Sequence, residues 1–226
     1  DKYVSSILAP IDKTSQELYG LKIGDYRYTQ FNLADLDSPF RDCERLVPES
    51  ELAYCYTGIG HNLFLFSEFS PQGYRSMFDK CKNVSLDHKT DCYAFLVYRI
   101  GINEAAVKFL SGKPEEGLKI CNEITLETGI DGMRKHCILG IGGGIGLFID
   151  SEFSHMKITE DNLSSMQKTI LKYINMCSAV DDASEKDCYR GLLGTKVKSF
   201  YKQLNIQNVI IEELLPESDD GFQVVG

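Results

Sequence analysis

Features that identify many membrane and nucleic-acid-binding proteins are missing from this sequence. The longest apolar run, Ile138 to Ile149, has twelve residues, five of them glycine, whereas a membrane-spanning helix needs about 20 apolar residues. The net charge of −9 provides no basic surface for a phosphate backbone. The sequence therefore predicts no transmembrane segment and no nucleic acid as the main partner.

Motifs that carry chemistry are also missing. The sequence has no Gly-x-Ser-x-Gly, His-Glu-x-x-His or Cys-x-x-Cys element, so a serine nucleophile elbow, a zinc protease and a close thiolate zinc site are not indicated. The glycine run at residues 140–146 does not fit the dinucleotide pattern G-x-G-x-x-G, because Ile145 and Leu147 stand where the last glycine is needed. We predict no cofactor and no metal ion.

The sequence does contain eight cysteines, which fall into four pairs at repeat-like spacing. The pairs are Cys43 with Cys55, Cys81 with Cys92, Cys121 with Cys137, and Cys177 with Cys188. Three of the second cysteines begin a Cys-x-x-Gly element that ends at Gly58, Gly140 and Gly191. A recurrence at roughly forty residues is typical of paired-helix repeats.

Apolar spacing predicts a helical hairpin around each cysteine pair, with one cysteine ending the first helix. In the second unit, Tyr74, Met77, Phe78 and Cys81 share one face of a helix that begins near Pro71. Two further stripes follow the same rule: Leu118, Cys121 and Ile124, and Met166, Ile170, Tyr173 and Cys177. The returning helices are expected to begin near Glu51, Thr90, Met133 and Glu185, with Asp87, Asp131 and Ser184 as N-caps.

The hairpins favour disulfides within each pair. Eight cysteines allow on the order of 100 pairings, but a hairpin brings the end of one helix beside the start of the next, within the reach of a disulfide. Disulfides favour an oxidising compartment, so we expect an exported protein that is extracellular, on the cell surface or in a periplasm-like space. The alternative is a cytosolic solenoid in which the cysteines are free and buried.

Small residues and polar side chains add four further expectations. Glycines one helical turn apart in residues 140–146 predict a helix that a neighbour approaches closely. Asn83 and Asn162 each begin an Asn-x-Ser sequon, which makes them candidate glycosylation sites. His61, Tyr93 and His136 are the candidate ligand contacts. His88 and His155 are expected in loops.

The ends of the chain differ in composition from the middle. Residues 1–40 form a tyrosine-rich N-terminal extension without cysteine, residues 41–204 form the cysteine-stapled repeat domain, and residues 205–226 form a C-terminal tail. Exposed tyrosines suit an interface because they bring large apolar area at low entropic cost. The alternative for the extension is that it covers the apolar face of the first hairpin.

The repeat resembles a known architecture. Paired-helix units with small residues at helix contacts are similar to the solenoids represented by tetratricopeptide and Sel1-like repeats. The Cys…Cys-x-x-Gly-x-Gly element resembles one in exported bacterial and archaeal proteins of unassigned function. The resemblance covers about residues 41–204, but Phe95 stands where a glycine is expected and the chain lacks the tryptophan of the tetratricopeptide pattern. It implies a scaffold or binding surface and carries over no catalytic residue.

We therefore expect an all-α protein, a right-handed solenoid of about four disulfide-stapled helical hairpins. Its expected function is protein–protein interaction or assembly within a cell-surface or envelope complex, without chemistry of its own. A second hypothesis is a small-molecule or ion-binding module that uses a groove near His61, Tyr93 and His136. A third is an enzyme whose site residues converge only in three dimensions.

Overall fold

Helices make up all the regular structure in the part of the chain described here. The computed structural model describes residues 35–52, 55–56, 58–60, 63, 71–153 and 155–194, and no β-strand occurs among them. Most of the tyrosine-rich extension and the whole C-terminal tail predicted from the sequence lie outside these residues. Within them, no helix has the length and apolar character that crossing a membrane requires. The predicted all-α class is confirmed.

Four disulfides link neighbouring helices, and they join the pairs expected from the spacing. The bonds are Cys43–Cys55, Cys81–Cys92, Cys121–Cys137 and Cys177–Cys188, with Cα–Cα distances of 5.9, 5.7, 5.5 and 5.6 Å. All eight cysteine side chains are fully buried. Each bond therefore lies in the packed interior and joins two segments that are close together in the chain.

The chain divides into two compact units, Asp1–Leu96 and Val97–Gly226. Unit 1 contains α3 (Asp37–Leu46), the 3₁₀ helix η1 (Glu49–Glu51), α5 (Pro71–Cys81) and most of α6 (Leu86–Ile100), and residues 52, 55–56, 58–60 and 63 are also helical. Its largest fully buried side chains include Phe40, Tyr74, Phe78 and Tyr93.

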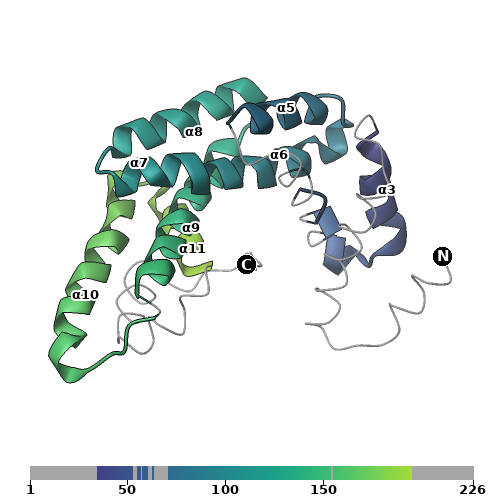
Figure 1. Cartoon of the computed structure of the whole chain (residues 1–226). Helices are drawn as coiled ribbons and strands as arrows, with labels where there is room; N and C mark the ends of the chain where they lie inside the picture. Colours follow the sequence, from purple (N-terminus) through teal and green to yellow (C-terminus); the bar gives the residue numbers. More distant parts are fainter. Residues whose placement is uncertain are drawn as a thin grey trace. The chain divides into compact units, whose positions relative to one another are not determined.

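Unit 2 is built around one long apolar helix (Figure 1). Its elements are the π-helix η2 (Gly101–Ala105), α7 (Ala106–Leu110), α8 (Pro114–Thr128), α9 (Met133–Phe153), α10 (Glu160–Ile174), the 3₁₀ helix η3 (Asn175–Ala179) and α11 (Glu185–Gly194). α9 packs against η2, α8 and α11, and its middle turns are buried on all sides. α9 is therefore the core helix of this unit.

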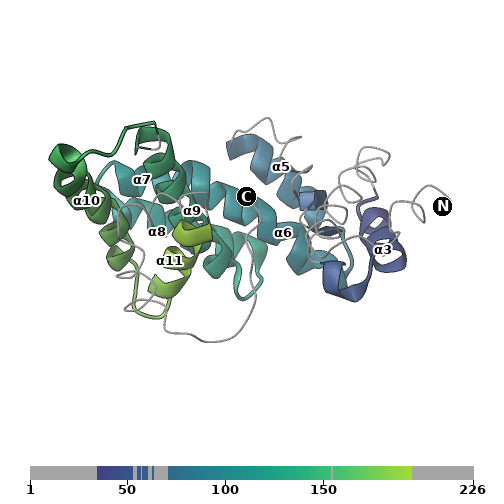
Figure 2. The same cartoon turned by 90° about the horizontal axis from the view of Figure 1, so that it is seen from below.

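Glycines at the centre of α9 allow backbone-to-backbone contact, as the glycine run predicts. A Cβ on Gly142 would lie 1.7 Å from the carbonyl oxygen of Cys188, and one on Gly191 would lie 1.9 Å from that of Leu139. α9 and α11 therefore cross side by side at a pair of glycines (Figures 1 and 2). On another side of α9, a Cβ on Gly140 would lie 2.1 Å from the carbonyl oxygen of Tyr98.

The start of α9 is tied to its neighbours by one arginine. The guanidinium of Arg134 donates to Asn122 Oδ1 on α8 at 2.9 Å, to Ser184 Oγ at 2.6 Å and to the carboxylate of Asp181. The hydrogen bond from Arg134 holds the pKa of the Asp181 carboxyl below its usual value. This charge-assisted network holds together α8, the start of α9 and the residues before α11.

Most predicted helix starts agree with the structure, and one is wrong. α5, α9 and α11 begin at Pro71, Met133 and Glu185 as expected. α6 begins at Leu86 and not near Thr90, because Asp37 Oδ1 accepts the N–H of Ser85 at 2.8 Å and positions the first turn.

Of the three predicted N-caps, one agrees with the structure and two are wrong. Ser184 precedes α11 as expected, and its carbonyl accepts the N–H groups of Asp187 and Cys188. Asp87 lies inside the first turn of α6 and is not its cap. Gly132, at φ +89°, and not Asp131, immediately precedes α9, and its carbonyl accepts the N–H of Lys135. Both corrections have a tertiary or backbone cause that side-chain preference alone does not reveal.

Candidate functional site

The residues singled out by the sequence as ligand contacts do not form one described site. His61 lies outside the described residues. Tyr93 is 1% exposed, and its hydroxyl donates to the carbonyl of Phe78 at 3.2 Å, while its ring packs edge-on against that of Phe78 at 5.3 Å. Tyr93 thus satisfies its polar group within the core of unit 1, which is a packing role.

His136 lies near the start of α9 in unit 2 and is half-buried. Burial lowers the pKa of its imidazole below the ordinary value of 6.5; the positive charge of Lys135 lowers it further, and Asp187 opposes both. The folded protein therefore favours the neutral imidazole at this position.

The stability of the protein is expected to fall as the pH decreases below about 6.5, in part because of His136. The unfolded chain binds a proton there at the ordinary pKa, whereas the folded chain does so only at a lower pH, so the proton favours unfolding across that window. Urea unfolding at about pH 7.5 and about pH 5 should show a smaller loss in His136→Gln than in the wild type. His155→Gln, at an exposed position, is the matched control. Equal pH dependence in wild type and His136→Gln would contradict the assignment.

His88 is the histidine that the sequence misplaced. It lies in α6 and is 6% exposed, not in a loop. Its ring stacks on Phe40 with centroids 5.0 Å apart and meets Tyr56 edge-on at 5.7 Å. Its Nε2 atom lies 3.5 Å from Glu44 Oε1. The burial of His88 could not be predicted from its own segment, because its neighbours come from α3 and from Tyr56.

The titratable groups of Asp91 and Tyr56 lie near His88 in unit 1. Burial raises the pKa of the Asp91 carboxyl, and His88 opposes that rise. Burial, with the charges of Glu44 and Asp91, raises the pKa of the Tyr56 hydroxyl to about 12. No group of three metal-ligating side chains occurs anywhere in the described ranges. His88 is thus buried at the edge of the core of unit 1, and the Glu44 carboxylate beside it is exposed.

Unit 2 carries a different cluster, which reaches the surface. Tyr173 on α10 meets two side chains of α9: Phe148 edge-on at 5.0 Å and Phe153 at 6.5 Å. These three aromatic residues are half-buried, and we call them the α9–α10 aromatic cluster. Leu147, beside Phe148 in α9, is 45% exposed, and Met156, three residues after Phe153, is 49% exposed. Aromatic and methionine side chains are enriched where proteins meet.

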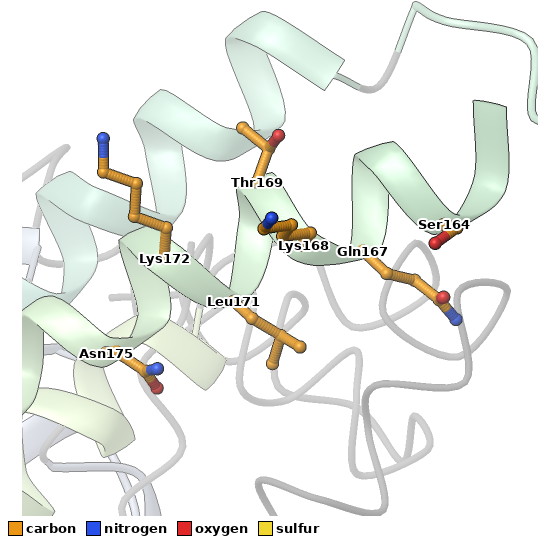
Figure 3. Close-up of a pocket in the computed structure, with 7 residues that line it drawn as sticks. All are labelled: Ser164, Gln167, Lys168, Thr169, Leu171, Lys172 and Asn175. Carbon is orange, nitrogen blue, oxygen red and sulfur yellow. The ribbon is translucent and has the colours of Figure 1, made fainter.

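An open depression of about 770 Å³ lies along α10. Its described lining comes from that helix and the residue after it: Ser164, Gln167, Lys168, Thr169, Leu171, Lys172 and Asn175. Lys172 and Thr169 point away from Leu171 and Asn175 (Figure 3). Side chains that diverge from one helix do not converge on a ligand atom, so this surface provides no catalytic arrangement.

No protein-family model, curated protein or solved structure matches this chain. Among the described residues, the α9–α10 aromatic cluster combines half-buried aromatic rings from two helices.

Proposed function

We propose that this chain is an exported protein that acts by binding a partner protein, as a subunit of a cell-surface or envelope assembly, without chemistry of its own. The four buried disulfides support export, because such bonds persist mainly in oxidising compartments. In this proposal the α9–α10 aromatic cluster is the contact surface in unit 2.

The proposed interaction rests on one observation, which is that the aromatic side chains of the cluster are partly exposed. Phe148, Phe153 and Tyr173 are half-buried against one another, so their rings are held in place before any partner arrives. Ordered aromatic side chains lose little conformational entropy on binding. Leu147 and Met156, which are close to these rings in the sequence, add exposed apolar side chains.

We further propose that the helical hairpins stack as a right-handed solenoid. The repeated Cys-x-x-Gly element supports this, because its glycines sit at helix contacts in unit 2: Gly140 against Tyr98, and Gly191 against Leu139. In unit 1, Gly60 packs against Phe95, and a Cβ there would lie 2.5 Å from that of Phe95. The side chain of Phe95 in one helix therefore occupies the space left by the missing side chain of Gly60 in the other. This accounts for a phenylalanine where the repeat predicts a glycine.

A charge placed beside the cluster tests the interaction. Leu147→Glu is expected to weaken partner binding at least tenfold, because a carboxylate at this exposed position of α9 must lose its water when a partner covers it. Leu126→Glu is the matched control, since Leu126 lies on α8 in the same unit, away from the cluster, and is 82% exposed. A photo-reactive amino acid at Met156 would identify the partner in extracts of the source cells, and titration of that partner would give both affinities.

The control separates the outcomes. Loss of binding in Leu147→Glu with wild-type affinity in Leu126→Glu supports the proposed surface. Equal affinity in the two variants would exclude the cluster as the contact. Cross-linking only to a second copy of the chain would make the assembly a homo-oligomer, and light scattering on the same variants would then show whether the cluster holds it together.

A further inference from the structure

The two sequons differ in structure, and we infer that Asn83 is the N-glycosylation site of this protein whereas Asn162 is not. The inference rests on the proposed export, because the transfer takes place in the exported chain. Asn83 lies in unit 1, whereas Asn162 and the proposed contact surface lie in unit 2.

Asn83 lies in the short turn between α5 and α6 and is exposed. The backbone of this turn is fixed: Asn83 N–H donates to Lys80 O and Val84 N–H donates to Cys81 O, both at 3.2 Å. Within the part of the chain that the structure describes, the Asn83 carboxamide itself makes no hydrogen bond. Its Nδ2 atom is accessible to a transferase.

Both residues that define this sequon are exposed. Val84 is 5% exposed, while Asn83 and Ser85 on either side of it are exposed. Asp37 Oδ1 accepts the N–H of Ser85 at 2.8 Å, which holds the backbone at the end of the sequon. A transferase can therefore reach both the asparagine and the serine of this sequon.

The side chain of Asn162 takes part in the capping of α10. It lies in the first turn of α10, where its Oδ1 accepts the N–H of Thr159 at 2.8 Å as part of a capping box. Its Nδ2 donates to the carbonyl of Lys157 at 2.9 Å. Both polar atoms of the side chain are therefore engaged. Residues i and i+2 of a helix do not face each other, so Ser164 projects away from the Asn162 carboxamide.

N-glycosylation places a bulky polar group on the Asn83 Nδ2 atom. Asn83 Nδ2 attacks the anomeric carbon of an oligosaccharide carried on a lipid diphosphate; the new N–C bond replaces the C–O bond to the diphosphate. The lipid diphosphate leaves with the electron pair, and Nδ2 gives up one proton to the medium. A glycan at Asn83 extends into solvent, as such modifications require. A glycan at Asn162 would interrupt the capping of α10.

The test directs the full chain into a glycosylating secretory compartment with a cleavable signal sequence. A C-terminal Asn-x-Thr tag reports arrival, so a failure of native export does not affect the result. Glycopeptide mass spectrometry and release by peptide-N-glycosidase are expected to show a glycan at Asn83 in the wild type and in Asn162→Gln. In Asn83→Gln and Ser85→Ala, only the tag should carry one.

Two results would overturn the inference. One is a chain whose tag is glycosylated while Asn83 is bare; the other is a glycan at Asn162 in the oxidised, folded protein. Synthesis in the presence of a membrane-permeant reductant keeps the disulfides open, and Asn162 should then accept a glycan as well. If Asn162 stays bare under reductant, its exclusion does not come from the fold.

Discussion

Replacing Gly142 with alanine is expected to lower the free energy of unfolding by about 3 kcal/mol, at the upper end of the range for overpacked cores. The added Cβ would lie 1.7 Å from the carbonyl oxygen of Cys188 and 2.8 Å from the backbone nitrogen of Leu192. Both are backbone atoms of α11, so only a shift of the whole helix relieves the clash. Cys188 is also bonded to Cys177, which limits that shift.

Gly143 provides a matched control one residue away in the same helix. A Cβ there meets the hydroxyl oxygen of Tyr98 at 2.8 Å, the end of a side chain that can rotate. Gly143→Ala also gains helix propensity of about 1 kcal/mol, so its stability should stay within about 1 kcal/mol of the wild type. Denaturant unfolding of the two variants side by side gives the comparison. Similar stability in both would mean that α9 and α11 do not cross at Gly142 in solution.

The features that could be predicted from the sequence depend on residues close together in the chain. The cysteine pairs are separated by 11 to 16 residues, so a hairpin brings each pair together whatever the rest of the fold does. Pro71 and Pro114 begin α5 and α8 because proline suits the first turn of a helix. The glycine run indicates close helix packing because its glycines recur one helical turn apart within residues 140–146.

The parts that could not be predicted depend on contacts between distant segments. The start of α6 is moved by Asp37, which is 48 residues from Ser85 in the sequence. His88 is buried by Phe40 and Tyr56, neither of which its own segment reveals. Tyr173 is on the predicted apolar stripe of its helix, yet only the structure places α9 aromatic rings against it. A periodic stripe predicts a buried face but not the partner of that face.

Removing the Cys121–Cys137 disulfide, with Cys121→Ala and Cys137→Ala together, is expected to lower the free energy of unfolding by about 3 kcal/mol. This bond spans 16 residues, the longest separation of the four, and chain entropy gives that magnitude for a ring of about this size. It joins α8 to the core helix α9. Denaturant unfolding of the double variant against the oxidised wild type measures the loss.

The reduced wild type is the control for that loss, because it lacks the same covalent link. Unfolding in reductant should bring the wild type and the double variant within about 1 kcal/mol of each other if the ring, and not the altered side chains, is responsible. The eight cysteines are fully buried, so reductant and alkylating agent should add eight alkyl groups only once denaturant opens the fold, since exchange requires access to the sulfur. Alkylation of unreduced protein in denaturant would show free thiols in solution. That result would contradict the disulfides, and with them the argument for export.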